Sequence, residues 1–194
     1  MRSPEFTIFV GPMFGSKTTK LLAAIDRYKY RNKNVIAFKP KIDDRYSDDQ
    51  ISTHSGGRFP AIPIGSGDDL FFWWAEQSTD YNVIAVDEAF MIPGISTALL
   101  TMFKSGLDII VSSLDLSASL RTFEEVEKIL PWATRVEKCP AVCTICNDDA
   151  FYTYRKIDGI AEITIGGADL YEPRCWLHHS LFSRDGMIKA CEDD

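Results

Sequence analysis

The stretch "GPMFGSKTTKLL" (residues 11–22) joins an apolar run to a segment with helical periodicity. The run before it, "FTIFV" (residues 6–10), has the character of a buried parallel strand. In the segment after it, residues 18–32, apolar side chains recur at spacings of three and four, at Leu21, Leu22, Ile25 and Tyr28. A phosphate-binding loop is credible where a strand is followed by a glycine-containing turn, Lys-Thr and a helix, in that order. The stretch therefore predicts a nucleotide-binding α/β fold.

The chemistry of phosphate binding assigns a role to each part of this loop. Backbone N–H groups at the start of a helix hold phosphate oxygens. We expect the ammonium group of Lys17 to reach the β- and γ-phosphates of a bound nucleotide, and the hydroxyl of Thr18 to bind Mg²⁺. The expected nucleotide-binding residues of the loop are Gly11, Pro12, Met13, Phe14, Gly15, Ser16, Lys17 and Thr18.

The loop departs from the standard pattern at one point. The standard form has glycine directly before the lysine, whereas this chain has Ser16 there and Gly15 one place earlier. A serine in a glycine-like backbone conformation costs roughly 1–2 kcal/mol, and Gly15 offers another flexible point to absorb that strain. Because catalysis commonly lowers a barrier by ~8–23 kcal/mol, such a strain would slow an enzyme without abolishing it. The alternative is a plain strand-to-helix turn.

Strand-like and helix-like segments alternate five times in the first part of the chain, which predicts a P-loop NTPase-type α/β fold with a mostly parallel sheet flanked by helices. Segment 41–57 has no regular period and is expected to be a long exposed loop. The expected strands are 6–10, 34–40, 81–89 and 107–115, and the expected helices are 18–32, 69–78, 95–106 and 122–133.

From Cys139 onward the sequence changes to paired cysteines and short strands, expected at 151–156 and 161–166, with a turn at Asp158-Gly159. We expect three regions. Residues 1–138 form the nucleotide-binding domain, residues 139–185 form a small zinc-binding lobe, and residues 186–194 form a disordered acidic tail.

The composition excludes several classes of partner. The chain has 194 residues and a net charge of −7, which argues against non-specific binding to nucleic acid. Its apolar runs are too short to span a membrane. Five cysteines, an odd number, fit a reducing compartment better than a disulfide framework, so we expect a cytoplasmic protein.

An acidic pair ends the third expected strand, "VIAVDEAF" (residues 83–90). A carboxylate at this position, on a strand expected to lie beside the first, is where a P-loop protein places the group that organises Mg²⁺. Asp87 and Glu88 are both candidates for that role. An acidic pair at a strand end is weak evidence for a metal site on its own, because such pairs are often simply solvated. Together with the loop, it becomes strong evidence.

Two cysteine-containing knuckles have the spacing of a tetrahedral zinc site. They are Cys143-Thr-Ile-Cys146 and Cys175-Trp-Leu-His178. Four protein ligands leave no position for water, so the expected metal is structural, and we expect the lobe not to order without it. Buried free thiols are one alternative, and His179 is an alternative fourth ligand.

Six motifs occur in the order found in type II thymidine kinases, the cytosolic and phage-type family, and the chain resembles that family from about Phe6 to His178. The motifs are "GPMFGSKTTKLL", "ISTHSGG", "VIAVDEAF", "SSLDLSASLRTF", "CTIC" and "IGGADLYEPRCWLH". The resemblance implies transfer of the γ-phosphate of ATP to the 5′-hydroxyl of thymidine. It also implies a zinc lobe whose "lasso" loop closes over the base, and a homotetramer inhibited by thymidine triphosphate.

The resemblance also implies roles for individual residues. Glu88 would be the general base for the 5′-hydroxyl, and Asp87 would organise the Mg²⁺ ion. Ser55 is expected to contact the bound nucleotide. The base pocket would contain Met13, Leu114, Ala118, Phe123 and Thr153. The lasso would contain Glu162, Ile163, Thr164, Ile165, Gly166 and Tyr171, and it would hold the base largely through main-chain hydrogen bonds.

Several positions depart from the family pattern. Phe90 and Met91 stand where glutamine and an aromatic residue are usual, and Leu116 and Ala118 where glycine and phenylalanine are usual. Ser55 replaces an acid. One lost aromatic contact is worth ~0.5–1.5 kcal/mol, enough to shift base preference. Thymidine is the first expected substrate, and a modified or different pyrimidine deoxynucleoside is the alternative. The rivals are a nucleotide-binding regulator with weak turnover and a P-loop ATPase or GTPase; the zinc lobe and lasso argue against the latter.

Overall fold

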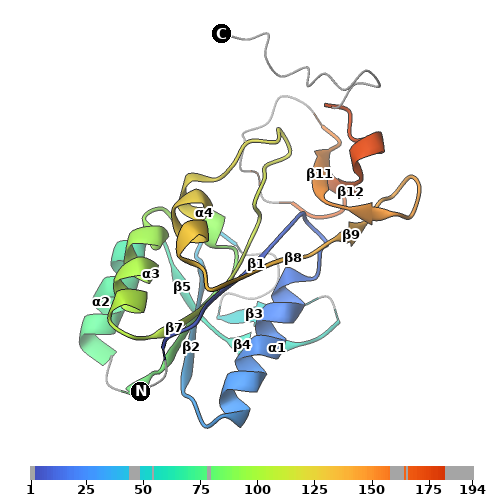
Figure 1. Ribbon diagram of the computed structural model, residues 1–194. Helices are drawn as coiled ribbons and strands as arrows, with labels where there is room; N and C mark the ends of the chain where they lie inside the picture. The colour runs from blue at the N-terminus through green and yellow to red at the C-terminus, as the bar shows by residue number, and fades with distance from the viewer. Residues whose placement is uncertain are drawn as a thin grey trace.

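The computed structural model describes residues 3–43, 49–53, 55–77, 80–157, 164 and 166–181. Its centre is a six-stranded sheet in the order β5-β2-β6-β7-β1-β8, in which every neighbouring pair is parallel (Figure 1). The strands are β1 (Phe6–Val10), β2 (Val35–Pro40), β5 (Ile62–Ile64), β6 (Val83–Val86), β7 (Asp108–Ser113) and β8 (Arg135–Lys138). The predicted α/β fold with a parallel sheet is confirmed.

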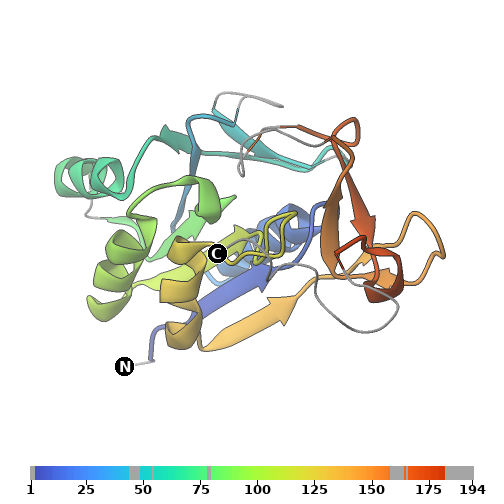
Figure 2. The same ribbon diagram turned by 90° about the horizontal axis from the view of Figure 1, so that it is seen from above.

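Helices cover both faces of this sheet (Figures 1 and 2). They are α1 (Lys17–Tyr30), α2 (Gly67–Gln77), α3 (Ile95–Lys104) and α4 (Glu124–Ile129). Successive side chains of a strand point to opposite faces. In β1, Ile8 belongs to the apolar cluster that contains α2, α3 and α4, whereas Phe9 belongs to the cluster that contains α1. Because both faces are buried, the central strands are continuous apolar runs.

The order of the strands corrects one expectation. β6, which leads to Asp87, is not beside β1, because β7 lies between them and pairs with both. All three strands still end at the same edge of the sheet, since they are parallel. Side chains at the end of β7 therefore lie between the phosphate-binding loop and the acidic pair.

Several strands lie where the sequence did not predict them. β8 is an edge strand with three exposed residues and a charged sequence, so it lacks the apolar signal of a central strand. β3 (Gln50–Ser52) lies inside segment 41–57, which was expected to be a loop, and it pairs antiparallel with β4 (Arg58–Pro60) just after that segment. The expectation of an irregular loop is wrong there, and the buried side chain of Ile51 is the physical reason.

The helix expected in segment 122–133, and expected to be ended by Pro131, stops just before that residue. α4 ends at Ile129 and a 3-10 turn, η3 (Leu130–Trp132), follows. Pro131 lacks an N–H group and cannot continue an α-helix. A second 3-10 turn, η2 (Ala89–Met91), follows the acidic pair. No helix among the described residues combines the length and apolar character needed to cross a membrane.

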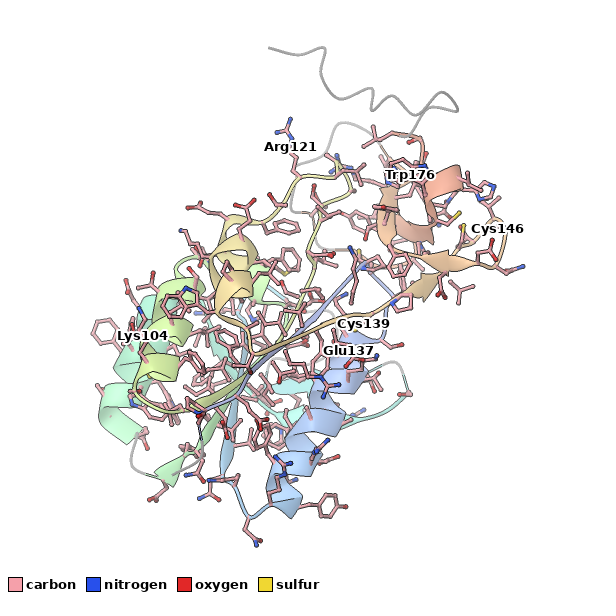
Figure 3. All side chains as sticks on the ribbon, viewed as in Figure 1. Lys104, Arg121, Glu137, Cys139, Cys146 and Trp176 are labelled. Atoms are coloured by element: carbon pink, nitrogen blue, oxygen red, sulfur yellow. The ribbon has the colours of Figure 1, made fainter. Side chains whose placement is uncertain are left out.

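The C-terminal lobe is built from two small antiparallel pairs, and it lies beside the sheet in Figure 2 (orange and red). The pairs are β9 (Ala141–Val142) with β10 (Asp149–Ala150), and β11 (Tyr152–Arg155) with β12 (Tyr171–Arg174), followed by the turn η4 (Trp176–His178). Figure 3 shows Cys139 where β8 leads into this lobe. β11 confirms the strand expected at 151–156. The turn at 158–159, most of the strand expected at 161–166 and the tail 186–194 lie outside the described residues.

Candidate active site

The phosphate-binding loop follows β1 and contains three residues with left-handed backbone. The φ angles are 141° at Gly11, 66° at Phe14 and 56° at Ser16. Ser16 thus adopts the conformation for which glycine is standard, at a cost of roughly 1–2 kcal/mol. Gly15 does not absorb this strain, because its φ is not in the left-handed region. That part of the sequence interpretation is wrong.

Gly15 is required for space rather than for its φ angle. A β-carbon on this residue would lie 2.6 Å from the carbonyl oxygen of Cys139, and one on Gly11 would lie 2.3 Å from the same oxygen. The Cys139 amide in turn donates to the Val10 carbonyl over 2.7 Å. The segment after β8 therefore presses directly on the loop, and only glycine fits at both contact points.

Lys17 is buried and folds back over the loop. Its ammonium group donates to the Pro12 carbonyl oxygen over 2.6 Å. Burial lowers the pKa of Lys17, and the negative charges of Glu88 and Asp87 partly oppose this effect. Both carboxylates are thus close enough to act on the lysine, as expected of a loop and an acidic pair that share one site.

Asp87 is held by hydroxyl groups from two elements. The Thr18 hydroxyl donates to Oδ1 over 3.1 Å, and the Ser112 hydroxyl, at the end of β7, also donates to Oδ1. Burial, and after it the negative charge of Glu88, raise the pKa of Asp87 to about 7, although the hydrogen bonds from Ser112 and Thr18 act in the opposite direction. A hydroxyl and a carboxylate oxygen side by side are the kind of ligands that Mg²⁺ takes from a protein.

Glu88 occupies the left-handed turn between β6 and η2, with φ 49° and ψ 47°. The turn is supported by β7, because the Phe90 amide donates to the Ser113 hydroxyl over 3.2 Å. Left-handed non-glycine residues concentrate at functional sites, where the surrounding structure holds them in place.

The loop and the acidic pair meet in one cavity of about 310 Å³. It is lined by the expected residues Met13, Phe14, Gly15, Ser16, Lys17, Thr18, Ser55, Asp87 and Glu88. Gly11 and Pro12 do not line it and instead shape the loop beneath it. Met13 lines the cavity. Its amide does not point to a phosphate site, because it donates to the Thr153 hydroxyl over 3.0 Å.

Apart from Met13, the residues expected around a nucleoside base do not line this cavity. Leu114 is buried, Ala118 is partly exposed, and the Phe123 ring lies 4.6 Å from the ring of Phe90. Phe90 therefore replaces the usual glutamine with an apolar contact to an expected pocket residue. In the lasso, the Tyr171 hydroxyl donates to the Thr164 carbonyl over 2.9 Å. Gly166 is partly exposed, and Glu162, Ile163 and Ile165 lie outside the described residues.

The sequence interpretation missed several residues of the site. Ser112 was not assigned a role, although a polar residue at the end of an apolar parallel strand is a detectable signal. Lys39 and Asp43 are buried and line the cavity from the end of β2 and the turn after it. Gly167 lines it from the lobe, next to the expected lasso.

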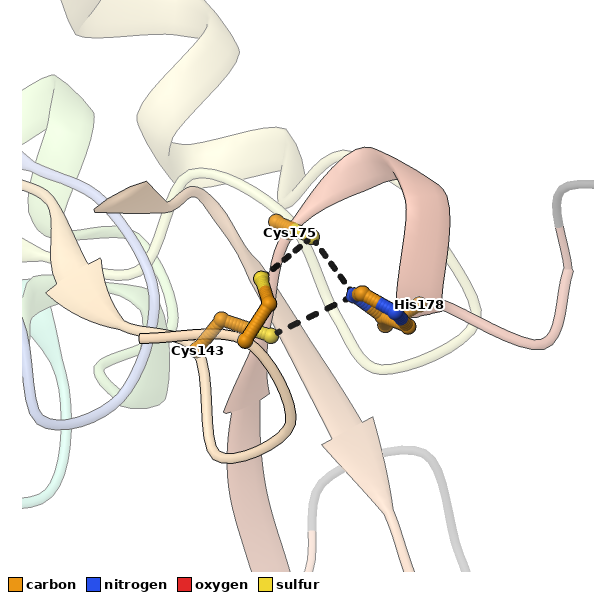
Figure 4. Close-up of side chains that lie close together, drawn as sticks. Cys143, Cys175 and His178 are labelled. Atoms are coloured by element: carbon orange, nitrogen blue, oxygen red, sulfur yellow. Dashed lines mark hydrogen bonds between the residues drawn. The ribbon is translucent and has the colours of Figure 1, made fainter. Parts of the chain in front are cut away.

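A second cluster lies in the C-terminal lobe, where one ligand atom from each of Cys143, Cys146, Cys175 and His178 lies within 4.8 Å of the others (Figure 4). The sulfurs of Cys146 and Cys175 are 3.6 Å apart, and the Cys143 sulfur is 3.9 Å from His178 Nδ1. A tetrahedral zinc site with bonds of about 2.3 Å places its sulfurs roughly 3.8 Å apart, so the cluster fits zinc.

The electrostatics of the metal-free cluster favour a thiolate at one cysteine. Burial raises the pKa of Cys143, but backbone amides, that of Cys175 foremost, outweigh burial and lower it to about 6. The backbone amide of Asp148 acts to lower the pKa of Cys146, but burial and the hydrogen bonds with Cys175 and Cys143 raise it to about 11. A thiolate is the form that binds metal.

The alternative fourth ligand, His179, faces elsewhere: its Nε2 is 3.2 Å from the Thr153 carbonyl oxygen. Cys139 lies outside the cluster, with its sulfur 3.5 Å from the Glu137 carbonyl.

Comparison with known proteins gives two findings. The sequence model of a family described as thymidine kinase matches residues 5–179. A thymidine kinase of Pyrobaculum aerophilum is 33% identical to this chain over 180 residues, which cover 90% of this chain and 97% of the relative.

Proposed function

Because the chain belongs to the thymidine kinase family, we propose that it transfers the γ-phosphate of ATP to the 5′-hydroxyl of thymidine and releases ADP and thymidine monophosphate. One observation carries this proposal: the phosphate-binding loop, Asp87 and Glu88 line a single cavity of about 310 Å³. A triphosphate and an alcohol can therefore meet between a positively charged loop and a carboxylate.

Phosphoryl transfer requires positioning and charge stabilisation more than covalent help from the protein. Lys17 supplies the positive charge. An ammonium group has three N–H donors, so it can keep its bond to Pro12 and still donate to phosphate oxygens. Burial lowers the pKa of Lys17 in the free protein, and an anionic ligand beside it would favour the charged form again.

Thr18 and Asp87 are the residues that would hold Mg²⁺, whose charge neutralises phosphate oxygens during the transfer. The Thr18 hydroxyl and the Asp87 carboxylate are already 3.1 Å apart. Ser112 fixes the carboxylate from the other side. Since the pKa of Asp87 is about 7, the carboxyl group exchanges its proton for a cation near neutral pH.

Glu88 is the proposed general base. As the 5′-oxygen of the nucleoside forms its bond to the γ-phosphorus, the bond from that phosphorus to the β–γ bridging oxygen breaks, and Glu88 accepts the hydroxyl proton. Its left-handed turn and the Phe90–Ser113 hydrogen bond fix the start of its side chain. A fixed base lowers the entropy cost of reaching the reactive geometry.

Base recognition is proposed for Met13, Leu114, Ala118, Phe123 and Thr153, with Tyr171 and the lasso residues 162–166. The Phe90–Phe123 contact makes the pocket side of η2 apolar, which suits a pyrimidine with a methyl group. Thymidine is the first substrate and a modified pyrimidine deoxynucleoside the second. The proposal further includes a nucleotide-binding domain at residues 1–138 and a lobe at residues 139–185 that holds structural zinc. It also includes assembly as a homotetramer and a cytoplasmic location.

The test is a transfer assay with labelled ATP, Mg²⁺ and a panel of pyrimidine deoxynucleosides. We expect monophosphate formation with thymidine, and its loss in Lys17→Ala and Glu88→Gln. Glu76→Gln, on the exposed surface of α2, is the matched control and should retain activity.

Two outcomes would contradict the proposal. Tight triphosphate binding without product on any acceptor would identify a regulator. Phosphate release that does not depend on a nucleoside would identify an ATPase. Product formation with another pyrimidine in preference to thymidine would keep the reaction and change the substrate.

A further inference from the structure

The phosphate-binding loop is bonded to the metal lobe through Thr153. The Met13 amide, in the middle of the loop, donates to the Thr153 hydroxyl oxygen over 3.0 Å. Thr153 lies on β11, and only 3% of it is exposed. An amide that loses its acceptor where water cannot replace it costs about 1–3 kcal/mol. Met13 is half-buried, so its hydrogen bond favours one loop conformation by part of that amount.

The same threonine is bonded to the residue beside a metal ligand. His179 directly follows His178, and its Nε2 is 3.2 Å from the Thr153 carbonyl oxygen. Its Nδ1 accepts from the Leu181 amide over 3.4 Å, so Nε2 carries the proton and donates to Thr153. Only 2% of His179 is exposed, and the rings of Tyr152 and Tyr154 pack edge-on against it.

Further contacts to the loop and to α1 come from β8 and from Cys139, which follows it. The Cys139 carbonyl lies against Gly11 and Gly15, as described above. Lys20, one turn into α1, forms an ion pair with Glu137 on β8. The strained loop residues Phe14 and Ser16 therefore lie between two points where the C-terminal part of the chain holds the loop.

We propose that Thr153 is a positioning residue that holds the phosphate-binding loop in its nucleotide-binding shape, and that the Cys₃His centre fixes Thr153 through His178 and His179. Affinity for ATP then depends on whether the metal site is filled, although no metal ligand touches the nucleotide cavity. The inference rests on the proposed function only in taking ATP as the ligand of the loop.

The contact explains how strain in the loop is maintained. Left-handed Phe14 and Ser16 persist only where neighbouring structure over-determines them. The Met13–Thr153 hydrogen bond fixes the residue directly before Phe14. Without it, the loop can relax to conformations in which its amides no longer converge on the phosphates.

The experiment compares Thr153→Val, which has nearly the same shape and no hydroxyl, with Thr153→Ser, which keeps the hydroxyl. Thr144→Val is the matched control, because Thr144 is an exposed residue of the same lobe. The readouts are amide hydrogen exchange over residues 12–15 in the nucleotide-free protein, zinc content, affinity for a non-hydrolysable ATP analogue, and separate KM and kcat values.

We expect faster exchange in Thr153→Val, a loss of analogue affinity on the order of tenfold, and a rise in the KM for ATP that exceeds the change in kcat. Zinc content should stay at the level of the unmodified protein in all three variants. Thr153→Ser is judged by exchange and analogue affinity alone, which should equal those of the unmodified protein, because Thr153 is also proposed to contact the base. Thr144→Val should match the unmodified protein in every readout. Equal impairment of the serine and valine variants would overturn the proposal, because a methyl contact rather than the hydroxyl would then be responsible.

Metal depletion of the unmodified chain tests the second half of the proposal and does not depend on any variant folding. Removing zinc with a chelator should accelerate exchange over residues 12–15 and weaken analogue binding, and it should weaken binding by Thr153→Val much less. Unchanged exchange in a protein shown to lack metal would refute the coupling. If the unmodified protein binds no ATP analogue at all, the proposed function fails, while the exchange readout still decides whether the lobe holds the loop.

Discussion

A β-carbon on Gly15 would lie 2.6 Å from the carbonyl oxygen of Cys139, closer than real β-carbons approach another atom. The neighbouring Ser16 is exposed on the cavity side and carries the left-handed backbone angle instead. In this chain, the need for a small residue and the need for a positive φ angle therefore fall on two different residues of the loop. Space is met by glycine at 15, and the angle is tolerated by serine at 16.

This separation predicts opposite effects for two single substitutions. Gly15→Ala should destabilise the protein by about 1–3 kcal/mol, because the added methyl group overpacks against a backbone carbonyl that cannot rotate away. Ser16→Gly should raise stability by about 1 kcal/mol, since it relieves the left-handed strain. Urea denaturation of both variants checks this, and a Gly15→Ala protein as stable as the parent would show that Cys139, after β8, does not press on the loop.

Asp87 predicts a pH dependence of stability in the metal-free protein. Its folded pKa is raised from 3.8 to about 7, so between these values the folded state binds more protons than the unfolded state. The free energy of unfolding must therefore fall as the pH rises from about 4 to about 7, by at most about 1.4 kcal/mol per pH unit from this group. Asp87→Asn should lose that part of the slope, which denaturation at pH 5 and pH 8 measures.

Ser112 predicts a shift in the pH profile of activity. Its hydroxyl bonds to Asp87 and acts to lower the pKa of that carboxyl group. In Ser112→Ala the pKa of Asp87 should rise further, so the acidic limb of kcat/KM should move to higher pH. Saturating Mg²⁺ should reverse the shift, because a cation competes with the proton. Ser119→Ala, in the loop after β7, is the comparison variant, and identical acidic limbs in the two proteins would contradict the assignment.

The elements that could be predicted from sequence are those with a local signal. The central strands are apolar on both faces, so β1, β2, β6 and β7 were identified from composition alone. β8 was missed because an exposed edge strand needs no apolar run, and its sequence, "RVEK", resembles a surface loop. β3 was missed because three residues are too few to show alternation.

The parts of the site that are formed by residues close together in the sequence could be predicted. The parts that depend on contacts between residues far apart in the sequence could not. The loop, the acidic pair and the cysteine spacing are local patterns. The bond from Ser112 to Asp87 joins residues 25 apart, and the bond from Met13 to Thr153 joins residues 140 apart. Met13 was expected to bind phosphate as part of the loop. Only the packing of β11 against the loop shows that the Met13 amide already donates a hydrogen bond to Thr153.

The five cysteines of the chain are expected to differ in their importance for metal binding. The sulfurs of Cys143, Cys146 and Cys175 belong to the cluster, whereas Cys139 is buried outside it. One zinc per chain is expected. Cys175→Ser should lose the metal and the protection of β11 and β12 from hydrogen exchange, since zinc binding supplies ~10–16 kcal/mol in comparable small sites. Cys139→Ser replaces an equally buried thiol and should retain the metal, which metal analysis measures directly. Zinc lost from Cys139→Ser and kept by Cys175→Ser would show that the ligands have been assigned wrongly.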